Sequence, residues 1–423
     1  MAGSIEDKAR RIEEAAVRAA EKLERKVERA ERKLESAGHA IERKFEAVER
    51  GLDSAMESLE NRLGEAERAI DATFESLEQK AEEFVNRLTT RSSRLERAYE
   101  GVTDSDDVIL ETKGLKKFFT RPGGRGGGRN IVRAVDGADF NIVHGETLGI
   151  VGESGCGKST AARCMIGLLE PTAGSVRLHG KDMNSGDRHQ RRELRMRTGI
   201  VFQDPFGSLD PRMSVAEIVS EPLRAKRPSF GKLERHLQAL DMIEAVGLQA
   251  DDLFKFPHQF SGGQRQRVCI ARALIAGPDL VVCDEAVSAL DVSIQAQIIN
   301  LLVDLRESRD LTYAFISHDL DVVRFIADRI AVMYLGRVVE MARKEELFSN
   351  PRHPYTIMLL ESAPVFGRKA KDADLTDPPE LSSEELSKGC RFRNRCPKST
   401  KECSSTDPEL RQSGKTHYTA CIN

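Results

Sequence analysis

The sequence predicts an α/β fold in which a largely parallel sheet is flanked by helices. One observation is the alternation of strand and helix patterns from Ile131 to about Arg343, which is typical of parallel strands joined through helical crossovers. Another is a glycine-rich loop at residues 152–160, between a short apolar strand pattern and a helix pattern. A third is the change of composition on both sides. No proline precedes Pro122, and the chain beyond Pro351 is rich in Pro, Ser and Cys.

These changes of composition predict three domains. Residues 1–103 are expected to form a long amphipathic helical segment, residues 108–350 the α/β domain, and residues 351–423 a small cysteine-rich extension. Within the α/β domain, a helical stretch broken by prolines at about 205–268 interrupts the alternation. It predicts an inserted helical subdomain.

The bulk composition restricts the classes of function. The chain has 423 residues, of which 39% are hydrophobic and 31% charged, and its net charge is −3 at pH 7. This balance gives no argument for nucleic acid as a partner. No run approaches the roughly 18 apolar residues that span a bilayer, and the first residues lack the apolar core of a secretory signal. We therefore expect a cytosolic chain whose contact with a membrane comes through a partner.

The first hundred residues carry an apolar stripe of helical period. Between Leu23 and Leu88 the apolar positions are three or four residues apart, with 18 steps over 65 residues, or 3.6 per step. This is the period of an undistorted helix, whereas a left-handed coiled coil repeats every 3.5 residues. We expect a long, coiled-coil-like helix or helical hairpin that buries its stripe against itself or a copy. The alternatives are a partner-docking arm and a helix on a membrane surface, the latter disfavoured by charges of mixed sign.

The glycine-rich loop fits the phosphate-binding pattern G-x-x-x-x-G-K-[ST]. It reads Gly152-Glu153-Ser154-Gly155-Cys156-Gly157-Lys158-Ser159-Thr160. Glycines allow the backbone to curl until successive N–H groups point at one anion, and the following helix presents its positive N-terminal end to the same anion. Lys158 is predicted to reach the β- and γ-phosphates of a nucleotide, and the Ser159 hydroxyl to bind Mg²⁺.

An apolar strand pattern that ends in two acids supplies a second part of the site. Residues 280–283 are apolar, and Asp284 and Glu285 follow them. A carboxylate at a strand tip beside a phosphate loop holds Mg²⁺ directly or through water, which suits Asp284. Glu285 is then placed to orient and polarise the attacking water. Such a strand is common by itself, and it is the phosphate loop that makes it informative.

A second glycine-rich turn opens another helix pattern. Ser261, Gly262, Gly263 and Gln264 precede the helical residues 265–274, and a helix N-terminus of this kind is again a site for an anion. One nucleotide does not need two such sites on one subunit. We therefore infer that this turn faces a γ-phosphate held by another subunit.

At these residues the sequence resembles the ATP-binding cassette (ABC) family, a group of phosphate-loop NTPases whose signature is S-G-G-Q. Other marks of the family are found at Gln203, at Asp291 in the run 288–291, and at His318 after an apolar run. The resemblance implies that Gln203 contacts Mg²⁺ and senses the nucleotide. It implies that Asp291 lies in the D-loop and that His318 is the switch histidine, which acts with Glu285.

An aromatic residue upstream completes the expected nucleotide site. In the run Lys116-Lys117-Phe118-Phe119, the resemblance makes Phe119 the residue that stacks on adenine. Phe118 is the competing choice, and packing in the core is the alternative role for either ring.

Two further stretches are similar to importers of the oligopeptide, dipeptide and nickel group. Residues 203–213 resemble the Q-loop region of that group, and residues 353–356, His-Pro-Tyr-Thr, resemble part of its chain beyond the catalytic domain. The resemblance covers roughly residues 108–423. One departure is Ala286, where family members usually carry proline after the acidic pair. It removes a local stiffener and leaves the catalytic groups in place.

The C-terminal extension contains four cysteines in a short span, Cys390, Cys396, Cys403 and Cys421, spaced C-x5-C-x6-C-x17-C. In a reducing cytosol, four thiolates in a segment without a core of its own favour a metal site over disulfides. The resemblance favours a [4Fe–4S] cluster with a structural role, because ATP hydrolysis involves no redox chemistry. Zinc and unligated thiols are the alternatives.

The resemblance implies an ATPase subunit of a peptide importer, which binds ATP and Mg²⁺ between two cassettes paired head to tail. Its partners would be two transmembrane permease subunits, a second ABC ATPase subunit and an extracytoplasmic solute-binding protein, with no role for nucleic acid. Its place would be the cytoplasmic face of the membrane. Two rival functions remain at this point. One is a non-transport ABC ATPase acting on nucleic acid or ribosomes, and the other is a scaffold protein that uses its N-terminal helix.

Overall fold

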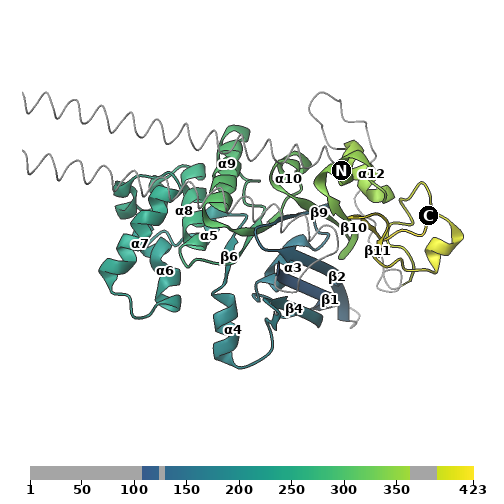
Figure 1. Ribbon diagram of the computed structural model, residues 1–423, viewed down its shortest axis with the longest axis horizontal. Coiled ribbons are helices and arrows are strands. Elements are labelled where there is room, and N and C mark those ends of the chain that lie inside the picture. Colours follow the sequence, from purple (N-terminus) through teal and green to yellow (C-terminus); the bar gives the residue numbers. More distant parts are fainter. Residues whose placement is uncertain (1–106, 123–128, 363–387) are drawn as a thin grey trace, which may run out of the picture. The chain divides into compact units, whose positions relative to one another are not determined.

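The computed structural model describes residues 107–122, 129–362 and 388–423 (Figure 1). The long helix predicted for residues 1–103 lies outside the described residues. So do residues 123–128 and 363–387. None of the described helices combines the length and the apolar character needed to cross a membrane.

An eight-stranded sheet forms the centre of the α/β domain. Its strand order is β11-β12-β10-β9-β3-β8-β7-β6, and the five strands from β9 to β6 run parallel to one another. The parallel strands are β3 (Thr147–Val151), β6 (Thr198–Val201), β7 (Leu280–Asp284), β8 (Thr312–Ile316) and β9 (Arg329–Tyr334). β10 (Arg337–Arg343) returns antiparallel beside β9. The predicted α/β fold with a largely parallel sheet is confirmed.

Strands β3, β7, β8 and β9 are buried along their whole length because each face of the sheet packs on a separate core. In β7, Leu280 and Val282 join the core that contains helix α3 (Lys158–Met165). Val281 and Cys283 join the opposite core, which contains α8 (Gly262–Leu274), α9 (Val292–Arg309) and α10 (Leu320–Ile326). Strands buried on both faces read as continuous apolar runs, without the alternation of a half-exposed strand.

A second, antiparallel sheet has the strand order β2-β1-β4-β5. Its strands are β1 (Val108–Pro122), β2 (Arg129–Val143), β4 (Ala173–Leu178) and β5 (Lys181–Asp182). The predicted parallel alternation from Ile131 onward is wrong for β2. It pairs with the preceding β1, and strands joined as a hairpin run antiparallel. Helix α3 packs between the two sheets through Ala161, Ala162 and Met165.

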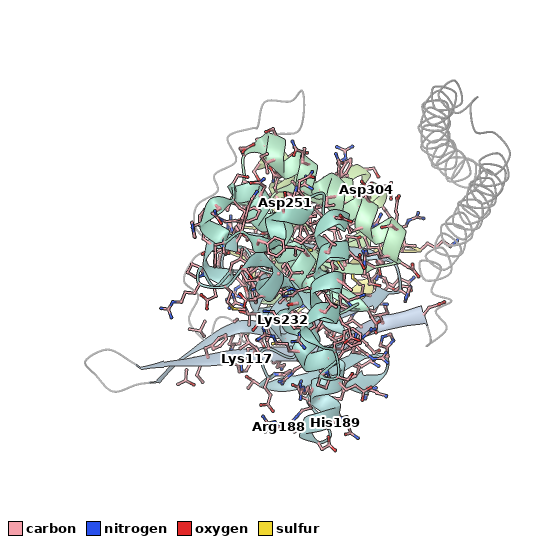
Figure 2. The ribbon with its side chains drawn as sticks, turned by 90° about the vertical axis from the view of Figure 1, so that its left-hand side faces the viewer. Lys117, Arg188, His189, Lys232, Asp251 and Asp304 are labelled. Carbon is pink, nitrogen blue, oxygen red and sulfur yellow. The ribbon has the colours of Figure 1, made fainter. Side chains whose placement is uncertain are left out.

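Helices occupy most of the chain between β6 and β7, the stretch for which an inserted subdomain is expected. They are α5 (Pro205–Ser208), α6 (Val215–Lys226), α7 (Lys232–Ala245), two short 3-10 helices (Ala250–Phe254 and Pro257–Gln259) and α8. Figure 2 shows them from the side, with Lys232 and Asp251 labelled. Helix α6 begins in a capping box, in which Ser214 and Glu217 satisfy each other's backbone N–H groups. Below them in the same view, helix α4 (Arg188–Arg195) follows β5.

The C-terminal extension is joined to the main sheet. After β10 the chain forms α11 (Lys344–Ser349) and α12 (Pro354–Ser362), and beyond residue 387 it adds a 3-10 helix (Lys401–Ser404), β11 (Arg411–Gln412) and β12 (Tyr418–Thr419). β12 pairs with β10, and Tyr355 and Phe392 belong to the core beneath α8 and α9. The extension, which was expected to have no core of its own, thus shares the core of the α/β domain.

Candidate functional site

The phosphate loop joins β3 to α3 through glycines in left-handed backbone conformations. Gly155 and Gly157 have φ of 77° and 105°, a region that glycine enters without a steric penalty. A Cβ on Gly157 would lie 2.0 Å from the carbonyl oxygen of Ala134, and a Cβ on Gly152 would lie 2.2 Å from that of Met333. The loop therefore approaches β2 and β9 so closely that both positions exclude a side chain.

Lys158 is held inside this loop. Its side chain is buried, and its ammonium donates to the carbonyl oxygens of Gly152 at 2.7 Å and Glu153 at 2.9 Å. A positive charge is thus fixed beside backbone that curls as an anion-binding loop does. Phosphate oxygens that enter the loop would meet the ammonium there.

Ser159 and Asp284 bring two oxygen ligands together between α3 and β7. The Ser159 hydroxyl donates to the Asp284 carboxylate at 2.7 Å. Burial raises the pKa of Asp284, although the hydrogen bond from Ser159 acts in the opposite direction. Hard oxygen donors at the end of a phosphate loop are what Mg²⁺ prefers, and a bound cation would stabilise the charged carboxylate. The two residues therefore fit a magnesium site.

Glu285 follows β7 with a φ of 50°, an uncommon conformation for a residue other than glycine. Its N–H donates to the Ile316 carbonyl of β8 at 3.1 Å. Its carboxylate accepts a hydrogen bond from the Gln203 amide at 2.8 Å and lies 3.6 Å from Nδ1 of His318. Three of the predicted site residues, which follow β6, β7 and β8, thus meet at one carboxylate.

The second glycine-rich turn forms the N-terminus of α8. Ser261 and Gln264 form a capping box, with the Gln264 N–H donating to the Ser261 hydroxyl at 3.3 Å and the Ser261 N–H donating to the Gln264 side chain at 3.0 Å. A Cβ on Gly263 would lie 2.5 Å from Ile294 of α9, whereas one on Gly262 would meet only Leu290 at 3.5 Å. Between the described residues of this turn and residues 152–160, no hydrogen bond or ion pair is formed.

Asp291, in the expected D-loop, forms hydrogen bonds with residues that follow it closely in the sequence. It is the N-cap of α9, and its carboxylate accepts hydrogen bonds from the Ile294 N–H at 3.0 Å and the Ser293 hydroxyl at 2.7 Å. These bonds, led by the one from Ile294, lower the pKa of Asp291. The residue is exposed, so a nucleotide or a partner can still reach it.

Phe119 lies on β1 with its ring partly exposed. Its side chain lies near Lys117, whose ammonium is 5.4 Å from the ring centroid. The competing residue Phe118 is less exposed, and the guanidinium of Arg133 lies 5.4 Å from its ring. Of the two rings, that of Phe119 is the more accessible to a flat base.

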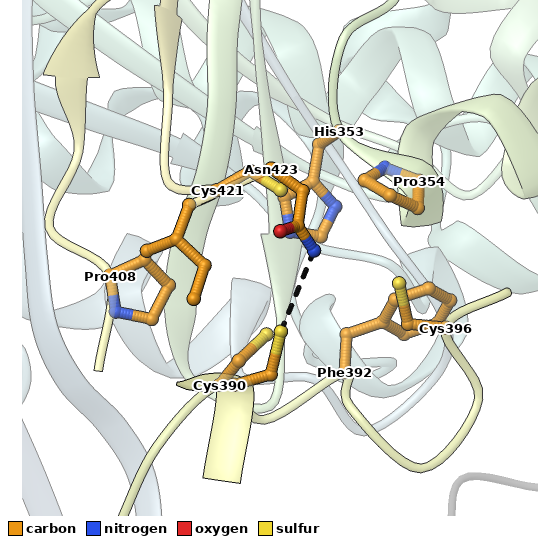
Figure 3. Close-up of a pocket in the computed structure, with 10 residues that line it drawn as sticks. His353, Pro354, Cys390, Phe392, Cys396, Pro408, Cys421 and Asn423 are labelled. Atoms are coloured by element: carbon orange, nitrogen blue, oxygen red, sulfur yellow. Dashed lines mark hydrogen bonds between the residues drawn. The ribbon is translucent and has the colours of Figure 1, made fainter. Parts of the chain in front are cut away.

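The four cysteines of the extension line one pocket, together with His353 and Phe392 (Figure 3). Within the described ranges, no group of three or more His, Cys, Asp or Glu side chains is arranged to hold a metal ion. The four cysteines predicted to act together therefore share one pocket.

Two residues that the sequence did not predict contact the phosphate loop. The Tyr355 hydroxyl accepts a hydrogen bond from the Glu153 N–H at 2.9 Å. The Arg395 guanidinium donates two hydrogen bonds to the Glu153 carboxylate, each 2.9 Å long. Both lie in stretches noted in the sequence, residues 353–356 and the first two cysteines of the extension. Neither pattern indicates a contact with the phosphate loop, because Tyr355 and Arg395 follow Glu153 by 202 and 242 residues in the sequence.

Family models match two parts of the chain. Residues 135–288 match the model described as ABC transporter, and residues 339–403 match the one described as oligopeptide/dipeptide transporter, C-terminal region. The first match includes the phosphate loop and Glu285. The second includes Tyr355 and three of the four cysteines.

Curated proteins and solved structures are similar over most of their own lengths. The oligopeptide transport ATP-binding protein AppF of Bacillus subtilis is 46% identical over 322 residues, 75% of this chain and 98% of the relative. The oligopeptide transport ATP-binding protein OppF of Escherichia coli is 43% identical over 327 residues, 76% of this chain and 98% of the relative. The dimeric post-hydrolysis structure of the ATP-binding cassette MJ0796 with ADP and Pi is 32% identical. Its TM-score is 0.50, and the match covers 56% of this chain and 99% of that one.

Proposed function

The chain belongs to the family of ATP-binding subunits of oligopeptide and dipeptide ABC transporters, and we propose that it uses the site around Glu285 to power peptide import. It is an ATPase that binds and hydrolyses ATP for transport. The observation that carries this conclusion is identity of 46% over 98% of a peptide-transport relative. A role on nucleic acid or ribosomes is not favoured, because the C-terminal match is to a transporter region.

Each group around the nucleotide receives a role from its chemistry. Lys158 and the loop N–H groups bind the phosphates, and Ser159, Asp284 and Gln203 would hold Mg²⁺, which would neutralise phosphate charge. Glu285 orients water and takes its proton as general base. His318 lies 3.6 Å from that carboxylate and keeps it directed at the water. Phe119 stacks on adenine, and Asp291 contacts the facing cassette.

The remaining phosphate contacts come from a second ATPase subunit. The turn at Ser261–Gln264 presents a helix N-terminus, and it forms no hydrogen bond to the described phosphate loop of its own chain. Two cassettes paired head to tail would place this turn on the γ-phosphate held by the partner. Loss of those contacts after hydrolysis would reopen the dimer. The partner is a copy of this chain or a sister ATPase.

The importer has further partners. Closure of the ATPase dimer is transmitted to two permease subunits through the region around Gln203. An extracytoplasmic binding protein delivers the solute. This places the chain at the cytoplasmic face of the membrane. The domains at 1–103, 108–350 and 351–423, with the helical subdomain at about 205–268, remain part of this proposal. The segment at 1–103 has no assigned role in it.

We expect an affinity-tagged form of the full chain, expressed in its native host, to co-purify two membrane subunits from detergent-solubilised membranes. Mass spectrometry would identify them as permeases. In liposomes, the complex should hydrolyse ATP faster when binding protein and peptides are added, and Lys158→Ala should abolish this response. A complex that contains ribosomal proteins in place of permeases would contradict the transport function.

The pocket of Cys390, Cys396, Cys403 and Cys421 is proposed to hold a [4Fe–4S] cluster. Its support is the convergence of the four cysteines on one pocket. Bound there, the cluster would tie residues 390–396 to the last residues of the chain as a structural staple. It has no part in ATP hydrolysis, which transfers no electrons.

Protein purified without oxygen is expected to be brown and to contain about four irons per chain. Cys396→Ser should lower the iron content by at least half. Cys269→Ala is the matched control, because that thiol is buried in α8, outside the pocket, and it should leave the iron unchanged. Colourless wild-type protein with one zinc per chain would identify the site as a zinc site instead.

A further inference from the structure

Glu153 is the residue of the phosphate loop that the C-terminal part of the chain holds. Its N–H donates to the Tyr355 hydroxyl at 2.9 Å. Its carboxylate forms the bidentate pair with Arg395, and its carbonyl oxygen accepts from the Lys158 ammonium at 2.9 Å. Backbone and side chain of one residue thus connect the C-terminal region to the lysine that meets phosphate.

The two residues that hold Glu153 are themselves fixed in place. Tyr355 of α12 is fully buried, and its ring packs on Tyr334 at 4.6 Å and on Phe392 at 5.5 Å between centroids. Only 9% of the Arg395 side chain is exposed, and its guanidinium lies 5.8 Å from the Phe392 ring centroid. Phe392 therefore supports both contacts with the loop.

The segment that contains Arg395 is anchored at both ends. It lies between Cys390 and Cys396, which both pack against the core of the α/β domain. Near its start, Arg391 forms a buried ion pair with Asp136 of β2 and donates to the Leu335 carbonyl oxygen. A residue held in this way loses little conformational entropy when it pairs with Glu153, so the pair is stronger than an exposed one.

Glu153 is an acid within an anion-binding loop, and Arg395 neutralises its negative charge. An unpaired carboxylate at Glu153 would repel the phosphates that the loop must bind. Pairing with a guanidinium neutralises it, and the hydrogen bonds to Glu153 raise the pKa of Arg395, so this charge is permanent. The bidentate geometry also fixes the direction of the carboxylate.

We propose that Arg395 and Tyr355 are positioning residues that hold Glu153, and through it the phosphate loop and Lys158, in the shape that binds ATP. The C-terminal extension is then part of the nucleotide site through its support of the loop, and the contacts of Arg391 with Asp136 and Leu335 keep Arg395 in place for this task. This inference rests on the proposed placement of the phosphates in the loop at residues 152–160.

The test is ATP affinity, measured by isothermal titration calorimetry on the full chain with Mg²⁺. Arg395→Ala is expected to weaken ATP binding about tenfold. Arg395→Lys keeps the positive charge but cannot form the bidentate pair, and it should weaken binding less. Adding Glu153→Gln to Arg395→Ala should recover most of the loss, because the repelling charge is removed. Tyr355→Phe keeps the buried ring and should weaken binding severalfold.

Matched variants separate this inference from the proposed site. Arg393→Ala is the control, because the hydrogen bonds from its guanidinium to the Lys388 and Cys390 carbonyls stay within the extension, and it should leave ATP affinity unchanged. Lys158→Ala tests the site itself, and unchanged affinity there would overturn the placement of the nucleotide. If Lys158→Ala weakens binding while Arg395→Ala and Tyr355→Phe do not, the positioning role is overturned. Failure of Glu153→Gln to rescue Arg395→Ala would overturn the claim that Arg395 also neutralises a carboxylate that repels phosphate. If Arg395→Ala does not fold, the ATP affinity of Tyr355→Phe decides whether the positioning role holds.

Discussion

Replacing Glu285 with glutamine is expected to lower the steady-state rate of ATP hydrolysis at least about a hundredfold, the size of effect typical of losing a general base. Glutamine keeps the shape of the side chain and can still accept the 2.8 Å hydrogen bond from the Gln203 amide. It carries no charge with which to polarise water. We propose that ATP binding depends on residues 152–160, so it should persist. Phosphate release measures the first quantity, and calorimetry with ATP and Mg²⁺ the second.

Two results would change the role of Glu285. Near-normal turnover in Glu285→Gln would remove it from the position of base. Loss of ATP binding would show that the contacts of Glu285 with Gln203 and His318 are needed to maintain the structure of the site. Glu345→Gln is a suitable control, because Glu345 is an exposed acid on α11 and the same chemical change there should leave turnover unaltered.

Replacing Gly262 with aspartate should prevent the ATP-driven pairing of two cassettes. On our proposal, the N-terminus of α8 faces the γ-phosphate of the partner, and like charges across such a contact cost several kcal/mol, which weakens pairing about a hundredfold or more. Within its own subunit the change is mild, because an acid at the N-terminus of a helix is stabilising. ATP binding to the separate subunit should therefore persist. Sedimentation with ATP, in subunits that carry Glu285→Gln, measures the pairing.

Gly262→Ala is the matched control for this experiment. A Cβ at Gly262 would lie 3.5 Å from Leu290, an ordinary contact, whereas one at Gly263 would lie 2.5 Å from Ile294. Alanine at residue 262 should therefore fold and pair almost normally. Pairing of Gly262→Asp at the wild-type ATP concentration would show that this turn does not face a phosphate.

The meeting of Ser159 with Asp284, and of Glu285 with Gln203 and His318, could be predicted from the sequence because these parts are short and lie at the ends of strands. The phosphate loop, Asp284, Glu285 and His318 each follow an apolar run, and the carboxyl ends of parallel strands meet at one edge of the sheet. The hairpin of β1 and β2 was harder to predict, since an alternating pattern of elements does not tell which strands pair. The pairing of Glu285 with Gln203 also depends on a backbone turn, φ 50°, that no pattern indicates.

The C-terminal extension shows a different limit of sequence reasoning. Its cysteines are conspicuous, and their meeting in one pocket is what their number suggests. Its strand β12 has only two residues, too few for a periodic pattern, yet it extends the main sheet. Arg395 is one of many arginines, and only the fold brings it to Glu153. Long-range contacts of single side chains leave no local signal.

The bridge between Glu153 and Arg395 has a consequence for biosynthesis. The two residues are 242 positions apart, and a ribosome adds roughly 5–20 residues per second. The phosphate loop therefore leaves the ribosome about 12–50 s before its arginine does, by the same rate. During that interval the nascent chain contains Lys158 and the glycines of the phosphate loop, but Glu153 has no ion pair with Arg395. On the proposed role of Arg395, a chain that stops short of it would contain every nucleotide-binding motif and still bind ATP about tenfold more weakly.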